Sequence, residues 1–112
     1  MTIREVVKLL DAEILCGEDR LDTEIHTACG SDMMSDVLAY VKDQSVLLTG
    51  LLNPQVVRTA EMMDMKCIIF VRGKVPGEDI LELARERDIV VMSSAIRMFI
   101  ACGLLYSRGL EG

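Results

Sequence analysis

Three short apolar runs dominate the hydrophobic pattern of the chain. They are Val46–Gly50, Cys67–Val71 and Ile89–Ser93, and they contain many β-branched residues with almost no polar interruption. Runs of this length and composition are typical of strands that are covered on both faces of a parallel sheet. The segments between them are long enough for a helix that crosses over and returns the chain parallel, so the pattern predicts two consecutive right-handed βαβ units.

The N-terminal part predicts a helix followed by two shorter strands. Thr2 and Glu5 have the spacing of a capping box, and apolar residues then recur at helical spacing until the helix ends near Asp11. Residues 12–16 predict a first strand and residues 24–30 a second, with a polar turn between them. This pair need not run parallel to the three apolar runs, so we expect a mixed sheet.

Further helices are expected where these strands end. Ser31 or Asp32 can cap a helix that ends within Tyr40–Gln44. Asn53 is a favourable N-cap for the next helix, and Pro54 suits the first helical position because no amide hydrogen is needed there.

A last helix is predicted after the third apolar run. Ser93 or Ser94 can cap it, and a short tail from Tyr106 to Gly112 follows. On one side this helix is expected to carry Ile96, Phe99, Ile100, Gly103 and Leu104.

Together these elements predict a single α/β domain over residues 1–112. Helices on both faces of a central, mostly parallel sheet give a three-layer α/β/α architecture, and the N-terminal strands make the sheet mixed. At 112 residues and 12.4 kDa the chain is long enough to bury a core of its own. We find no low-complexity segment or linker that would mark a second domain.

Composition argues against membranes and nucleic acids as partners. Hydrophobic residues make up 51% of the chain, but no stretch approaches the roughly 20 apolar residues of a membrane-spanning helix. The N-terminal segment has acidic residues within its apolar pattern, so we interpret it as a folded helix and not a signal peptide, and we expect the protein in the cytoplasm. The net charge of −6 and the scattered basic residues disfavour binding to nucleic acid.

Metal and nucleophilic chemistry are not indicated either. Cys16, Cys29, Cys67 and Cys102 are widely spaced within apolar sequence, and His26 is the only histidine. This spacing does not suit a metal site, so we interpret the cysteines as buried thiols in a reducing compartment. Because no nucleophile with a base partner and no glycine-rich phosphate loop is apparent, we predict neither an enzyme nor a bound cofactor.

Small and hydrogen-bonding residues follow the ends of the predicted strands. Ligands of open parallel sheets bind outside the carboxyl ends of the strands, where helix N-termini offer free backbone amides. The same residue types also serve as helix caps and in tight turns, so a purely structural role stays open for each. The candidate ligand-binding residues are Gly30, Ser31, Asp32, Thr49, Gly50, Asn53, Ser93 and Ser94.

The order of these motifs resembles the DRTGG domain family over nearly the whole chain. The shared features are a Gly-x-Asp at residues 30–32, Thr49-Gly50 after the next strand, an acidic helix before a Val-Val-Met-Ser strand, and a final helix. The literal Asp-Arg-Thr-Gly-Gly sequence does not occur. Met33 follows Asp32 where arginine is common, and Leu51 replaces a second glycine. The resemblance implies a fold similar to the N-terminal domain of HPr kinase.

The resemblance also implies a regulatory role. DRTGG domains usually form non-catalytic, regulatory or dimerising parts of larger proteins, including phosphate acetyltransferases and CBS-domain pyrophosphatases. Short stand-alone forms are expected beside signalling kinases and iron hydrogenase-like proteins in anaerobic microbes. We therefore expect a homodimeric regulatory module that senses a small polar metabolite or nucleotide at the strand ends. The alternative is a protein-interaction adaptor or dimerisation module without a small-molecule ligand, for a signalling kinase or a hydrogenase-like redox enzyme.

Overall fold

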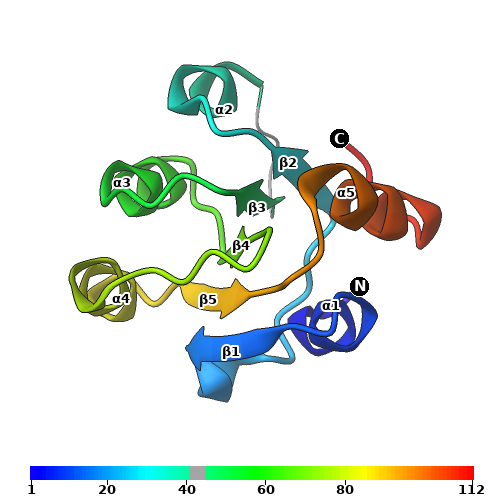
Figure 1. The fold of residues 1–112 in the computed structure, drawn as a ribbon, viewed down its shortest axis with the longest axis horizontal. Coiled ribbons are helices and arrows are strands. Elements are labelled where there is room, and N and C mark those ends of the chain that lie inside the picture. Colours follow the sequence, from blue (N-terminus) through cyan, green and yellow to red (C-terminus); the bar gives the residue numbers. More distant parts are fainter. Residues whose placement is uncertain (41–44) are drawn as a thin grey trace.

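The described part of the chain, residues 1–40 and 45–112 of the computed structural model, contains one five-stranded sheet with the order β1-β5-β4-β3-β2 (Figure 1). Strands β2 to β5 run parallel, and β1 pairs antiparallel with β5, so the predicted mixed, mostly parallel sheet is confirmed. The bounds are Glu13–Cys16 for β1, Thr27–Gly30 for β2, Ser45–Thr49 for β3, Cys67–Phe70 for β4 and Val90–Ser93 for β5.

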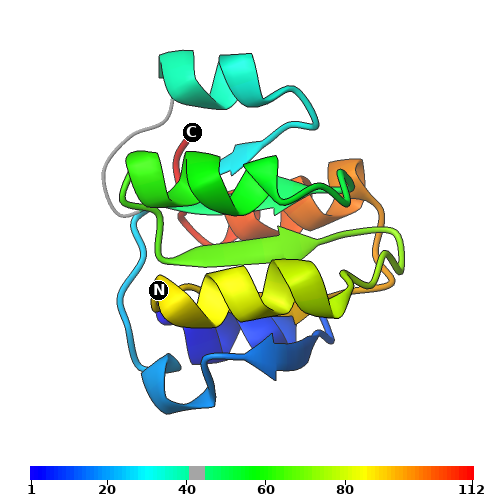
Figure 2. The same cartoon turned by 90° about the vertical axis from the view of Figure 1, so that its left-hand side faces the viewer.

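Helices cover both faces of this sheet, which confirms the three-layer α/β/α architecture (Figure 1). The three helices that connect the parallel strands, α2, α3 and α4, lie side by side on one face (Figure 2), because right-handed crossovers that step in one direction all fall on the same side. Helices α1 and α5 cover the other face. The bounds are Ile3–Leu9 for α1, Met34–Tyr40 for α2, Gln55–Met62 for α3, Glu78–Glu86 for α4 and Met98–Ser107 for α5, with a short 3-10 helix at Glu18–Arg20.

Two apolar cores lie on the two faces of the sheet. In the central strand β4, Ile69 packs into the core under α1 and α5, whereas Ile68 and Phe70 pack into the core under the other three helices. All four residues of β4 are buried, as expected for a strand with a helical layer on each face. The apolar runs therefore form the centre of the sheet, as their pattern predicted.

The N-terminal capping box is also confirmed. The Thr2 hydroxyl accepts a hydrogen bond from the backbone N–H of Glu5 at 3.2 Å, and the Glu5 carboxylate accepts one from the backbone N–H of Thr2, also at 3.2 Å. These bonds satisfy amides at the start of α1 that have no partner within the helix.

One prediction about the last helix was wrong. Helix α5 begins at Met98, with Arg97 as the cap residue, so neither Ser93 nor Ser94 caps it. The buried side of α5 is formed by Ala101 and Leu105, while Phe99, Ile100 and Gly103 are exposed. Because α5 is apolar on all sides, its periodicity carries no information about its orientation.

Residues 41–44 lie outside the described part of the chain, and the predicted end of the second helix falls there. The helix before them, α2, is confirmed as far as Tyr40. None of the helices in the described residues is long and apolar enough to cross a membrane.

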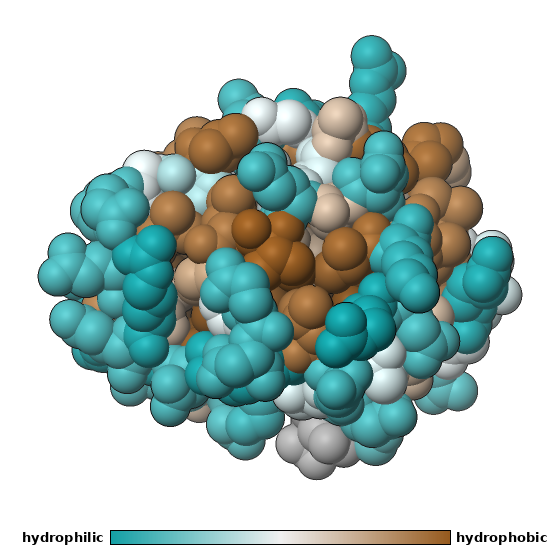
Figure 3. Space-filling view, turned by 90° about the horizontal axis from the view of Figure 1, so that it is seen from below, coloured by the Kyte–Doolittle hydropathy of each residue, from teal (hydrophilic) through white to brown (hydrophobic). Residues whose placement is uncertain are grey.

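The two edges of the sheet are protected in different ways. At the β1 edge, seen in Figure 3, an apolar area is surrounded by hydrophilic side chains, and a register shift between Ile14 and Cys16 interrupts the regular ladder. At the β2 edge, Glu111 forms a parallel bridge with Thr27. A bulged edge and a covered edge both oppose sheet extension by another strand.

Candidate functional site

The loops that follow β2, β3, β4 and β5 meet along one side of the sheet, which we call the carboxyl edge. The parallel registers place Gly30 beside Leu48, Thr49 beside Phe70, and Phe70 beside Ser93. The geometry expected from the sequence is therefore present.

Asp32 is the centre of a hydrogen-bond network at this edge. Its Oδ1 accepts from the backbone N–H of Gly50 at 2.7 Å and from the Thr49 hydroxyl at 3.0 Å. Its other oxygen, Oδ2, lies 3.4 Å from the Arg72 guanidinium. Asp32 thus joins the segment before α2 to the loop after β3, and it does not cap α2 as the sequence suggested. The turn before α2 is instead closed by Ser31, whose Oγ accepts from the N–H of Met33 at 2.9 Å.

This network favours the ionised form of Asp32. The hydrogen bond from the Gly50 N–H lowers the pKa of the carboxyl group most, against the opposing effect of partial burial. The Thr49 hydroxyl and the positive charges of Arg72 and Lys74 lower it further. At neutral pH the group is therefore a carboxylate that accepts hydrogen bonds and attracts cations.

Arg72 also belongs to this network, although the sequence pattern did not indicate it. Its backbone adopts a left-handed conformation with φ of 60°, and its N–H donates to the Ile96 carbonyl at 2.9 Å. This turn carries its side chain across Gly50, where a Cβ atom would overlap the guanidinium group. Gly50 does not have a positive φ, so close approach by Arg72 and not a special turn explains the glycine.

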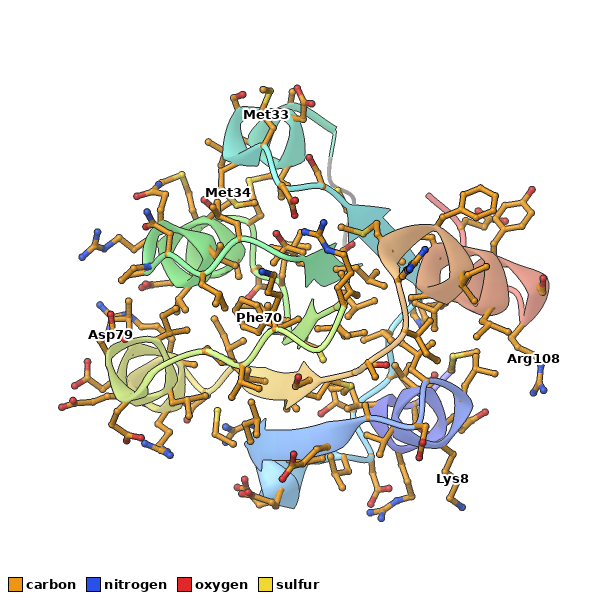
Figure 4. The ribbon with its side chains drawn as sticks, viewed as in Figure 1. Lys8, Met33, Met34, Phe70, Asp79 and Arg108 are labelled. Atoms are coloured by element: carbon orange, nitrogen blue, oxygen red, sulfur yellow. The ribbon has the colours of Figure 1, made fainter. Side chains whose placement is uncertain are left out.

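A shallow pocket of about 610 Å³ lies beside this network, between the starts of α2 and α3. Asn53 lines it, and its Oδ1 accepts a hydrogen bond from the Gln55 N–H at 2.8 Å. The N-cap position of α3 is occupied by Pro54 and the helix begins at Gln55, so the prediction of Asn53 as N-cap and Pro54 as first helical residue was one residue too early. In Figure 4, Met33 points outward and Met34 points towards α3, which gives the pocket apolar as well as polar walls. The complete lining is Ser31, Asp32, Met33, Met34, Ser35, Asp36, Leu51, Asn53 and Gln55.

Five of the eight predicted site residues do not line this pocket. Ser93 Oγ donates to the Lys74 carbonyl and Ser94 Oγ to the Leu10 carbonyl, each at 2.7 Å, and both serines are buried. Gly30 lies under α5, where a Cβ atom would come within 2.7 Å of the Cys102 sulfur. Thr49 and Gly50 do not line the pocket themselves, but both donate to Asp32, which does.

The cysteines do not form a reactive centre in the structure. All four are free, and burial raises the pKa of each thiol, most strongly for Cys67. A thiol with a raised pKa is a poor nucleophile at neutral pH. Across residues 1–40 and 45–112, histidine, cysteine and acidic side chains do not come together in groups of three that could hold a metal ion.

Comparison with known proteins identifies the family. The sequence model of the DRTGG domain matches residues 5–101, so the chain belongs to the DRTGG domain family. A search of curated proteins gave no match.

A solved structure has the same fold. It is the regulatory region of Clostridium perfringens pyrophosphatase, which contains CBS and DRTGG domains and was crystallised with its activator, diadenosine tetraphosphate. The TM-score is 0.73 with 18% sequence identity over 93% of this chain. Our chain covers 45% of that protein chain, so it spans less than half of its length.

Proposed function

We propose that this chain is a non-catalytic regulatory domain that senses a small polar metabolite or nucleotide in the pocket at the carboxyl edge. The observation that carries the proposal is the position of Asp32, which lines the pocket and also holds the Thr49–Gly50 loop and Arg72. A ligand that contacts Asp32 changes the bonds between α2 and the β3–α3 loop. Binding is thereby converted into a shift of α2, the step that a regulatory domain needs.

A nucleotide is the ligand class that the residues of this pocket and the related solved structure support best. Met33, Met34 and Leu51 offer apolar surface for a base, while Ser31 and Asn53 offer hydroxyl and amide groups for a sugar. Arg72 and Lys74 supply positive charge near Asp32 for phosphate groups. The related regulatory region was crystallised with a dinucleotide activator, which supports this ligand class. The free cysteines fit a role in the reducing cytoplasm.

Thermal-shift measurements with ATP, diadenosine tetraphosphate and acetyl phosphate test the proposal. A ligand that binds only the folded state raises its stability by about 2.7 kcal/mol at a hundred times its Kd, which corresponds to several degrees in Tm. We expect Asp32→Asn to abolish this shift. Asp79→Asn, the same substitution at an exposed position on α4 outside the pocket, should leave it intact.

The proposal is wrong if none of these compounds changes the Tm. It is also wrong if both aspartate variants respond as the wild type does.

The second candidate function is a protein-interaction adaptor or dimerisation module for a signalling kinase or a hydrogenase-like enzyme. A specific observation favours a protein partner: Phe99 is 85% and Tyr106 75% exposed, and both lie on α5, away from the pocket. The adaptor role requires a protein bound at this face and no small-molecule ligand.

A further inference from the structure

Two aromatic side chains stand free of the rest of the chain on helix α5. Phe99 is 85% and Tyr106 75% exposed, the highest values among the large apolar side chains of the described residues. They are seven residues apart, so they project from the same side of the helix, about 10 Å apart along its axis. Gly103 lies between them, and a Cβ atom built there would meet no packed neighbour within 4 Å. The helix surface between the two rings is therefore open.

This open surface belongs to an apolar groove of about 390 Å³, which we call the α5 groove. Helix α5 forms one wall, and residues 110–112, which run beside α5 in Figure 1, form the other, while β2 also contributes to the lining. Backbone hydrogen bonds hold the second wall, since Ala28 N–H donates to the Glu111 carbonyl at 2.8 Å and Leu110 N–H to the Leu105 carbonyl at 3.2 Å. Both walls are thus fixed by the fold itself.

The dimensions of the α5 groove suit a small flat molecule. Its volume lies within the roughly 300–1,000 Å³ of small-molecule sites. Aromatic rings attract one another when their centres are about 4.5–7 Å apart. A ring placed midway between Phe99 and Tyr106 lies about 5 Å from each along the helix axis, so it can contact both. A single flat ring system thus covers the two most exposed apolar side chains at once.

The charge of the groove restricts its occupant further. Among the described residues that line it, Glu111 is the charged one, and lysine and arginine do not occur. The Glu111 carboxylate forms no ion pair within the described parts of the chain. Arg108 lies at the outer end of α5 in Figure 4 and is not part of the lining. A carboxylate without an ion pair attracts positive charge and accepts hydrogen bonds from amino groups, but it repels phosphate.

We propose that the α5 groove binds a flat aromatic amine or heteroaromatic base that is neutral or positively charged and carries no phosphate group. The candidate pocket at the carboxyl edge has a different character, because Arg72 and Lys74 place positive charge beside it. The two sites also lie on opposite faces of the sheet, over different cores. The α5 groove is therefore a second ligand site, and binding there does not require a nucleotide at the carboxyl edge.

Proflavine and anthracenecarboxylate test the charge preference of the groove. Both are flat three-ring molecules, but at neutral pH proflavine is a cation with two amino groups and anthracenecarboxylate is an anion. At physiological salt, which screens distant charges, we expect fluorescence anisotropy to show that proflavine binds about tenfold tighter or more. Glu111→Gln should remove most of this difference, because it keeps the size of the side chain and removes its charge.

Gly103→Leu tests the position of the ligand. The added side chain fills the space between Phe99 and Tyr106, and we expect it to raise the dissociation constant of proflavine about tenfold or more. The chain has no tryptophan and two tyrosines, so in a Tyr40→Phe background the tyrosine emission comes from Tyr106. Proflavine should quench this emission at concentrations near its dissociation constant, and the same concentrations should leave it nearly unchanged once Gly103→Leu is added.

Controls separate loss of the groove from loss of the fold. A leucine in place of Gly103 meets no packed neighbour and favours a helix more than glycine does, so Gly103→Leu should unfold at an equal or higher denaturant concentration. Arg58→Leu adds an exposed leucine to α3 instead, and Asp32→Asn alters the network at the carboxyl edge. Both of these variants should bind proflavine as the wild type does.

The proposal is overturned if the wild-type chain does not bind proflavine, which is also the outcome if a second copy or another protein occupies the groove. Equal affinity for the two probes overturns it as well. So does binding that survives Gly103→Leu or that Asp32→Asn weakens to the same extent, because the probe would then bind elsewhere.

Discussion

At the scale of single residues, Gly50 is shaped by its neighbour and not by its own backbone. Its φ is not positive, but the end of the Arg72 side chain passes so close that a Cβ atom would overlap it. Because this side chain is flexible and about half exposed, we expect Gly50→Ala to displace it from Asp32 and to lower the free energy of unfolding by less than about 1 kcal/mol, the usual contribution of an exposed ion pair. In an Arg72→Ala background the same substitution should be nearly neutral, because the overlapping group is gone. Urea unfolding of the four proteins measures this, and equal costs in both backgrounds would contradict the contact.

The free energy of unfolding should depend on the ionisation of Asp32 at acidic pH. Its pKa is lowered in the folded protein by the Gly50 N–H, the Thr49 hydroxyl and Arg72, so its bonds stabilise the fold fully above the unfolded pKa of about 4. This stabilisation is lost as the pH falls through the folded pKa, below that value. We therefore expect the wild type to be more stable than Asp32→Asn at pH 7, with a difference that shrinks below about pH 4. A difference that stays constant down to pH 2 would show that the carboxylate is not held in this way.

At the scale of elements, the sequence predicted the strands better than the faces of the helices. The runs that became β3, β4 and β5 are short and uninterrupted because each strand is covered on both faces, and few other structural elements produce such a pattern. Helix α4 has one apolar stripe, and Ile80 and Ala84 on that stripe are buried. Helix α5 has no polar side to contrast with an apolar one, so no periodicity could show that Ala101 and Leu105 face inward.

The candidate site could be predicted only in part for a related reason. Parallel strands end on one side of a sheet, so the carboxyl edge and the proximity of Asp32 to Thr49 follow from topology. The contribution of Arg72 depends on a left-handed backbone residue in the loop after β4, which no local pattern in the sequence indicates. Ser93 and Ser94 look like helix caps in the sequence, but tertiary contacts with the Lys74 and Leu10 carbonyls determine their hydrogen bonds.

At the scale of the whole molecule, the sheet separates the structure into two cores that share their central strand. Ile69 belongs to the core under α1 and α5, and Phe70 to the core under α2, α3 and α4. The candidate pocket lies over the second core, since α2 and α3 provide its walls. The exposed apolar side of α5 lies over the first, since Ala101 and Leu105 anchor α5 there. Because the two surfaces lie over different cores, a structural change at one surface should affect the other only through the strands that separate the cores.

Double-mutant cycles in β4 test this separation of the two cores. We expect Ile69→Val and Phe70→Leu each to lower the free energy of unfolding by about 1 kcal/mol through loss of buried methyl or ring volume. Because these side chains point into different cores, the two effects should add to within about 0.5 kcal/mol. Ile68→Val with Phe70→Leu is the matched pair within one core, and its members share neighbours, so we expect a coupling energy of at least about 0.5 kcal/mol.

These measurements need one fixed protein concentration, because self-association adds concentration-dependent stability to the folded state. A coupling energy for the pair on opposite faces as large as that for the pair on the same face would mean that the sheet transmits packing changes directly. In that case, ligand binding beside α2 should also alter the affinity of the α5 face for a bound protein, and the two surfaces would have to be treated as one coupled unit.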